Sequence, residues 1–257
     1  MLLAFDVGNT TVAIGLFREA KLLKSWKIKT DPDKTSDEYG ALILDLFNVT
    51  GQEARRVDAA IISSVVPPLT SAIEDLCRDF FHVTALVVGP GLRTGMPILY
   101  ENPLEVGADR IVAAVAAFEK YGGPCIVVDF GTATTFDAIS ARGEYLGGAI
   151  APGIQISAEA LYLKTARLPR IEIRKPRKAI GRTTVGSMQS GLYFGYVGLV
   201  TNTIAEIRKE LGADAKVVAT GGFGGQITPE VAAIGAYEPD LVLDGLRIVF
   251  ERNREAK

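Results

Sequence analysis

The sequence predicts an α/β protein made of two related halves, each a mixed sheet with flanking helices. A strand–turn–strand unit occurs twice, around Asp6-Val7-Gly8-Asn9-Thr10-Thr11 and around Asp129-Phe130-Gly131-Thr132-Ala133-Thr134-Thr135. Further strands and helices follow each copy in a similar order. At 257 residues the chain is long enough for one large or two medium domains with sizeable cores.

Apolar patterning predicts the elements of the first half in order. Residues 2–5 and 12–17 are the strands around the first turn, and residues 21–29 form a third strand. We expect a helix over 37–48, capped by Ser36, because apolar residues recur there at helical spacing. A buried strand over 57–64, a helix over 69–80 and a strand over 83–88 follow. This succession predicts a mixed sheet with helices outside it.

The helix that follows starts with Asn102 as its cap and Pro103 at its first position, and we expect it to continue to residue 121. The second half then repeats the same order. Strands are expected over 126–129, 136–140, 144–150 and 217–220, and helices over 152–160, 185–211 and 241–250. Residues 221–225 are expected to be a loop, and 231–234 a short apolar segment. The glycines within 185–211 favour close helix packing or passage beside a ligand, because each weakens an exposed helix by about 1 kcal/mol.

Composition excludes several classes of function. The net charge of -2 gives no case for a nucleic-acid or membrane-surface protein. Cys77 and Cys125 lie in apolar sequence, so we expect two buried thiols in a reducing compartment. His82 is the sole histidine, too few for a His-based metal site or triad, and is expected at the edge of a strand. No signal peptide or membrane span is recognisable, so we expect a cytoplasmic protein.

The two turns combine groups that bind phosphate. Gly8 and Gly131 permit positive φ and let a ligand approach the backbone, while threonine hydroxyls and turn N–H groups can be aimed at one anion. Asp6 and Asp129 can each hold a metal through water, as Mg²⁺ prefers. One Asp-x-Gly is also an ordinary turn pattern. Two copies imply two half-domains that clasp one phosphate chain, with the working cleft between them.

Asp109 and Arg110 are adjacent charges near the start of an otherwise apolar helix. Two interpretations stay open. The pair is solvated on the outer face, or Asp109 is a general base and Arg110 an anion clamp facing the cleft. A carboxylate suits the late removal of an alcohol proton in a loose phosphoryl-transfer transition state, where little basicity is demanded.

Three glycine-rich segments also allow two interpretations each. Residues 218–222 could lay a glycine pair against an adenine or ribose, or form a common turn. Residues 147–153 could line a phosphate or turn a corner, and Thr184 in 181–184 is a candidate helix cap with or without a further role. No P-loop is present and no G-x-G-x-x-G follows a strand, so any nucleotide site must use the paired hairpins.

Together these motifs identify a resemblance. The two hairpins and the late Gly-Gly loop resemble the acetate/sugar kinase–Hsp70–actin superfamily. Within it, Gly107-Ala108-Asp109-Arg110, residues 147–153 and Gly181-Arg182-Thr183-Thr184 resemble the type III pantothenate kinase family. The resemblance runs from residue 1 to about 250, without a departure at any motif position.

The resemblance implies two ribonuclease-H-like, actin-like half-domains, residues 1–115 and 116–257, with the nucleotide and substrate cleft between them. It implies ATP-dependent phosphorylation of pantothenate on its terminal hydroxyl, the first step towards coenzyme A, by a homodimer. Mg²⁺ with ATP and a monovalent cation, K⁺ or NH₄⁺, are the implied cofactors.

The family's site residues carry over onto matching motif positions. Asp109 becomes the proton acceptor, Asp129 the monovalent-cation ligand, and Asp6 orients magnesium through water. The residues implied to contact ATP phosphates are Asp6, Val7, Gly8, Asn9, Thr10, Thr11, Val12, Ala13 and Thr132; those implied to contact pantothenate are Tyr100, Gly107, Ala108, Asp109, Arg110 and Thr184.

Two rival functions remain at this stage. A phosphohydrolase of the same superfamily would attack ATP with water, and would release phosphate without pantothenate. A non-enzymatic regulatory relative would keep the cleft only for binding, but such a protein has no need for a base at Asp109.

Overall fold

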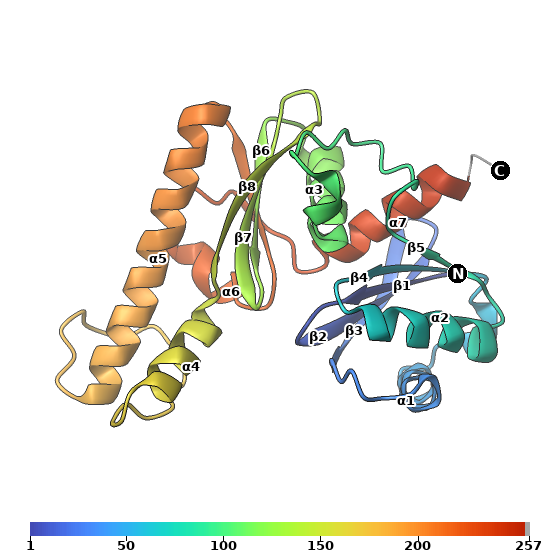
Figure 1. Cartoon of the computed structure of the whole chain (residues 1–257), viewed down its shortest axis with the longest axis horizontal. Helices are drawn as coiled ribbons and strands as arrows, with labels where there is room; N and C mark the ends of the chain where they lie inside the picture. The colour runs from blue at the N-terminus through green and yellow to red at the C-terminus, as the bar shows by residue number, and fades with distance from the viewer. Residues whose placement is uncertain (255–257) are drawn as a thin grey trace. The chain divides into compact units, whose positions relative to one another are not determined.

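The computed structural model describes residues 1–254 and divides into two compact units (Figure 1). Unit 1 comprises Met1–Lys120 and Asp240–Lys257, and unit 2 comprises Tyr121–Pro239. The expected halves, 1–115 and 116–257, differ from these units mainly in the last helix, α7 (Leu241–Arg254). This helix groups with unit 1 because it packs on strands β1, β2 and β4 of that unit.

Unit 1 is built on a five-stranded mixed sheet in the order β3-β2-β1-β4-β5. The central strand β1 pairs antiparallel with β2 and parallel with β4. The strands are β1 (Leu2–Val7), β2 (Thr11–Arg18), β3 (Lys21–Lys29), β4 (Ala59–Ser64) and β5 (Ala85–Val87). Alternate residues of β1 pack with α1 (Ser36–Val49) and α2 (Pro67–Phe81) in one core, and α7 lies against the sheet as well.

Unit 2 repeats this plan with the order β10-β9-β6-β7-β8. Its central strand β6 pairs antiparallel with β7 and parallel with β9. The strands are β6 (Cys125–Phe130), β7 (Ala133–Ile139), β8 (Tyr145–Pro152), β9 (Lys216–Thr220) and β10 (Ala236–Tyr237). The helices are α4 (Ile154–Lys164), α5 (Thr184–Leu211) and the short α6 (Gly224–Ile227).

The two sheets therefore share one topology. In each, the first strand is central, the next two follow it antiparallel on one side, and the last two run parallel on the other. This confirms the predicted fold of duplicated α/β halves with mixed sheets and flanking helices.

Several predicted element ends are wrong for local reasons. Thr35, not Ser36, caps α1, through a reciprocal pair of hydrogen bonds with Glu38. Thr183, not Thr184, caps α5, because its hydroxyl accepts the Gly186 N–H at 3.1 Å. His82 is not at a strand edge but caps the end of α2 with a left-handed φ of 58°.

The predicted helix from Asn102 to residue 121 is interrupted. Asn102 caps only a single 3₁₀ turn (Pro103–Glu105), and α3 (Ala108–Tyr121) begins separately after Val106 and Gly107. Val106 has extended φ and ψ, so the chain leaves the helical conformation there and re-enters it. Asp109 consequently lies in the first turn of α3.

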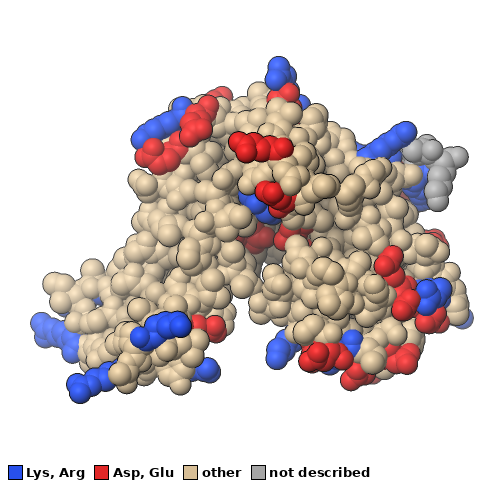
Figure 2. All heavy atoms as spheres, in the orientation of Figure 1, with Lys and Arg blue, Asp and Glu red and all other residues tan. Residues whose placement is uncertain are grey.

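The two cysteines, the helices and the surface charges can each be compared with what the composition predicts. Cys77 and Cys125 are free and buried, as predicted. Within residues 1–254, no helix combines the length and apolarity needed to cross a bilayer. Acidic and basic side chains intermix over most of the face in Figure 2, whereas basic ones predominate towards its lower left.

Candidate active site

The first hairpin joins the central strand of unit 1 to its neighbour. Asp6 and Val7 end β1, Gly8, Asn9 and Thr10 form the turn, and Thr11, Val12 and Ala13 begin β2. The Gly8 N–H donates to the Thr11 carbonyl at 3.1 Å, and the Thr30 hydroxyl donates to the Gly8 carbonyl at 2.6 Å. Asn9, Thr10 and Thr11 are exposed, so the tip of the turn is open to a ligand.

The second hairpin, in unit 2, also carries an aspartate next to the last residue of a central strand, but its turn is one residue shorter. Asp129 lies one residue before the end of β6, and Gly131 and Thr132 lead into β7. The Gly131 N–H donates to the Ala133 carbonyl at 3.1 Å, two residues on, whereas the Gly8 N–H reaches the Thr11 carbonyl three residues on. Neither Gly8 nor Gly131 adopts the positive φ that glycine permits. The remaining reason for glycine at these two positions is that a residue without a Cβ lets a ligand approach the backbone.

Other glycine-rich segments close around the second hairpin. The Gly153 N–H donates to the Thr132 carbonyl at 3.1 Å, and a Cβ at Gly153 would lie 2.6 Å from the Gly131 carbonyl oxygen. Gly221 has a φ of +89°, and a Cβ there would clash with Asp129 Oδ1. The end of β8 and the Gly-Gly loop after β9 therefore both lie against the hairpin, which brings Asp129, Thr132, Gly153 and Gly221 together.

Sequence reasoning missed a second polar group beside each acidic residue. In the parallel pairing of β1 with β4, Asp6 is the partner of Ser63; in that of β6 with β9, Asp129 is the partner of Thr220. Ser63 and Thr220 are both buried. The available signal was a hydroxyl residue directly after an apolar run in each of two strands, Ile61-Ile62-Ser63 and Val218-Ala219-Thr220.

Asp109 is held at the start of α3. Its Oδ1 accepts the Arg110 N–H at 2.9 Å, and a Cβ at Gly107 would clash with this oxygen. The same Cβ would lie 3.7 Å from Val65, the residue after β4. Asp109 is therefore in unit 1 near the carboxyl end of the strand that carries Ser63.

The electrostatics of Asp109 combine opposing effects. The carboxylate is half-buried, and burial raises its pKa above the ordinary value. The hydrogen bond from the Arg110 N–H and the charge of Arg110 lower the pKa in part. Arg110 is also half-buried, so neither residue is fully exposed on an outer face. A partly desolvated carboxylate next to an Arg is typical of functional sites.

The other residues implied to contact substrate lie in both units. Tyr100 is half-buried in the irregular segment before the 3₁₀ turn of unit 1. Thr184 is exposed at the first position of α5 in unit 2, where Gly181 packs against the first turn of the helix. That Thr184, Thr132 and Asp129 meet the unit 1 residues stays a prediction.

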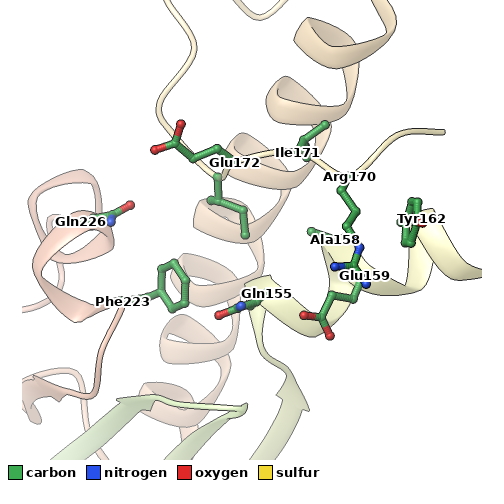
Figure 3. Close-up of a pocket in the computed structure, with 10 residues that line it drawn as sticks. Gln155, Ala158, Glu159, Tyr162, Arg170, Ile171, Glu172, Phe223 and Gln226 are labelled. Carbon is green, nitrogen blue, oxygen red and sulfur yellow. The ribbon is translucent and has the colours of Figure 1, made fainter. Parts of the chain in front are cut away.

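A pocket of about 420 Å³ opens in unit 2 beside the Gly-Gly loop (Figure 3). Phe223 from that loop and Gln155 from the first turn of α4 lie close together on one side of it, and Gln226 lies beyond Phe223. On another side the Arg170 guanidinium lies 4.8 Å from the centre of the Tyr162 ring. Gln155 is two residues after Gly153, whose N–H bonds the Thr132 carbonyl, so one lining residue of the pocket lies near that turn.

No cluster of three or more potential His, Cys, Asp or Glu metal ligands occurs among residues 1–254. The acidic residue of each hairpin instead has a hydroxyl residue, Ser63 or Thr220, as its partner on the neighbouring strand. This arrangement suits Mg²⁺ held through water and ligand phosphates rather than by a protein cage.

A comparison with known families decides the assignment. The family model described as type III pantothenate kinase matches residues 2–206. The chain belongs to the type III pantothenate kinase family. A type III pantothenate kinase of Pelobacter propionicus is 55% identical over 254 residues, which cover 99% of this chain and 100% of that protein. The corresponding protein of Geobacter sulfurreducens is 52% identical over 255 residues, with 99% and 100% coverage.

Solved structures of more distant proteins share the fold. A Campylobacter jejuni protein described as a Baf family transcriptional activator aligns with a TM-score of 0.63 at 18% identity, over 98% of this chain and 99% of that one. Component A of (R)-2-hydroxyglutaryl-CoA dehydratase from Acidaminococcus fermentans aligns with a TM-score of 0.55 at 11% identity, over 100% and 99%. At these identities the likeness concerns the actin-like fold alone.

Proposed function

We propose that the protein transfers the γ-phosphoryl group of ATP to the terminal hydroxyl of pantothenate, the reaction after which its family is named. Full-length relatives at more than half identity carry that name. The observation that supports the chemistry is the pair of hairpins, each with an aspartate at or near the end of a central strand and an open turn. A phosphoryl group needs positioning and charge stabilisation more than covalent help from the protein.

In this proposal Asp109 accepts the hydroxyl proton of pantothenate as the phosphoryl group moves. The hydrogen bond from the Arg110 N–H and the contact with Gly107 fix the carboxylate at the helix start. Gly107, Ala108, Arg110, Tyr100 and Thr184 are proposed to hold pantothenate. A base fixed in this way needs no reorganisation when the proton transfers.

The backbone and hydroxyls of Asp6–Ala13 and of Thr132 are proposed to hold the ATP phosphates. The N–H and hydroxyl donors at the exposed tip of the first turn suit an anion, because no charged side chain lies at that tip to repel it. The nucleoside is proposed to extend into the pocket lined by Phe223 and Gln155, since the Gly153 N–H bonds the start of α4 to the Thr132 turn.

The residues present fit a divalent and a monovalent cation. Asp6 lies beside a buried hydroxyl that lacks a hydrogen-bond partner among residues 1–254, which is the setting expected for an ion held through water. Magnesium would neutralise charge on the phosphates when bound. Asp129, whose Oδ1 lies against Gly221 and near Gly131, is proposed to hold K⁺ or NH₄⁺.

A coupled assay with ATP and pantothenate, run with and without K⁺, tests the function. We expect ADP formation that depends on pantothenate. Phosphate release independent of pantothenate would favour a phosphohydrolase, and nucleotide binding without turnover would favour a regulatory relative; either result overturns the proposal.

A further inference from the structure

Ser63 lies beside Asp6 on the neighbouring strand of unit 1. The two are partners in the parallel pairing of β1 and β4, and partners at one level of a parallel pair project to the same face. The alternate residues Phe5 and Ile62 belong to the core shared with α1 and α2. Asp6 and Ser63 therefore leave the sheet side by side on the opposite face.

The Ser63 hydroxyl is buried without a visible purpose in the fold. Its side chain is 0% exposed, and among the described residues 1–254 its Oγ has no hydrogen-bond partner. Such groups are rare in native proteins, since an unpartnered buried hydroxyl lowers stability. Ser64 differs, because its hydroxyl both accepts the Val66 N–H at 3.1 Å and donates to the Val66 carbonyl at 3.2 Å.

The position recurs in the other half of the molecule. Thr220 holds the same register position next to Asp129 and is 2% exposed. Each half thus sets a buried hydroxyl beside the acidic residue of its phosphate hairpin. A small apolar residue would satisfy packing at either place, so the recurrence points to a use for the hydroxyl.

We propose that Ser63 is a positioning residue for the divalent metal of the ATP site. Its hydroxyl bonds a water of the metal's coordination shell that Asp6 also holds, and so fixes the orientation of that water. The proposal rests on the proposed function, because the metal arrives with ATP. Mg²⁺ keeps several of its waters in protein sites, and groups that orient them change metal affinity or activity by about 10- to 100-fold.

The test compares Ser63→Ala with Ser64→Ala, the adjacent hydroxyl. The first measurement is the Mg²⁺ concentration that gives half-maximal turnover at saturating ATP and pantothenate. The second needs no turnover: it is the rise in Tm caused by a non-hydrolysable ATP analogue, with and without Mg²⁺.

We expect Ser63→Ala to need about tenfold more Mg²⁺ and to lose most of the Mg²⁺-dependent part of the Tm rise. Without ligands it should melt at the native temperature or above, because no partnered group is lost. Ser64→Ala should melt at a lower temperature and keep the native Mg²⁺ requirement. If Ser63→Ala does not fold, Ser63→Cys, which has a similar volume and a weaker donor, is measured in its place with the same expectation.

A native Mg²⁺ requirement and a native Mg²⁺-dependent Tm rise in the Ser63 variant would overturn the inference. A raised Mg²⁺ requirement and a smaller Mg²⁺-dependent Tm rise in Ser64→Ala as well would also overturn it. Native protein without pantothenate-dependent turnover would contradict the proposed function instead. The Tm measurement would still decide the role of Ser63 in that case.

Discussion

Asp109 is the residue on which the proposed chemistry depends most. Asp109→Asn keeps the size of the side chain and an acceptor for the Arg110 N–H, but removes the base. We expect kcat to fall by about 10²-fold or more, the loss typical of a positioned general base, with a much smaller change in pantothenate affinity. Steady-state kinetics measure both. Asp45→Asn, an exposed carboxylate on α1, is the matched control, and near-native turnover in Asp109→Asn would remove the residue from this role.

Asp109→Asn, which should lower kcat, should raise the stability of the folded protein. Burial raises the pKa of Asp109 above 3.8, so the native state binds a proton more readily than the unfolded state. The carboxylate therefore lowers the free energy of unfolding as the pH rises through the range between the ordinary and the raised pKa, and the loss persists above it. We expect Asp109→Asn to raise Tm at pH 7, and to raise it by less at pH 4. An equal Tm difference at both pH values would contradict the stated cause.

Asp129 is proposed to hold the monovalent cation in unit 2. Asp129→Ala should remove the activation of turnover by K⁺ over Na⁺ and leave a low residual rate, because the cation loses its charged ligand. Initial rates in matched KCl and NaCl measure this effect. Asp214→Asn, exposed in the same unit, should respond to K⁺ as the native protein does. A normal K⁺ response in Asp129→Ala would contradict the cation assignment.

At the scale of elements, the sequence predicted strands and hairpins well because buried runs such as those of β1 and β6 have few alternatives. Strand β3 ends where apolar alternation ends, at Lys29. Helix starts were less predictable, because adjacent hydroxyl residues compete for the cap. Thr35 wins over Ser36 since Glu38 lies at the third position from Thr35, where both hydrogen bonds can form.

The capping of α1 by Thr35 predicts unequal effects of two neighbouring substitutions. Thr35→Ala removes the hydroxyl that accepts the Glu38 N–H and should lower the stability of unit 1 by about 1 kcal/mol, or Tm by about 2–4 °C. Ser36→Ala replaces a residue inside the helix and should leave Tm nearly unchanged. Thermal unfolding measured by circular dichroism compares them, and the reverse order would contradict the cap. Turnover should stay native in both variants.

The site residues were predictable from the sequence only where they lie in contiguous motifs. The hairpins and Asp109 lie in short contiguous motifs, whereas Ser63 and Thr220 come to Asp6 and Asp129 through strand pairing. Pairing register depends on the whole sheet, so one sequence does not reveal it. The break at Val106 was also hidden, because Asn102 and Pro103 begin a 3₁₀ turn with the same signals that begin an α-helix.

At the scale of the whole molecule, duplication explains why each unit contributes one hairpin. Both sheets use the same strand order, so the turn after the first strand and the end of the fourth strand adjoin in each unit. The duplicated plan thus provides an acidic residue, a turn and a hydroxyl twice. The two copies have nevertheless diverged, since within residues 1–254 a glycine loop lies against the aspartate in unit 2 alone.

The long helix α5 has a face that the described part of the chain does not cover. Phe194 is 38% exposed, and a Cβ added at Gly191, Gly195 or Gly198 would have nothing within 4 Å among the described residues. Small residues spaced three or four apart let a second helix approach closely, and the exposed positions from Ser187 to Asn202 carry no charge. We propose that two copies of the chain associate along this face to form a homodimer.

Phe194→Glu should therefore convert the dimer to monomer, because a charge buried between two helices is not solvated. Light scattering after size-exclusion chromatography measures the mass against protein concentration. Val49→Glu makes the same change at an apolar residue on α1 that is 78% exposed, and should leave the dimer intact. A dimeric Phe194→Glu, or a monomeric Val49→Glu, would place the interface elsewhere. If pantothenate binding depends on the first turn of α5, where Thr184 lies, the monomer should also bind pantothenate more weakly than the dimer does.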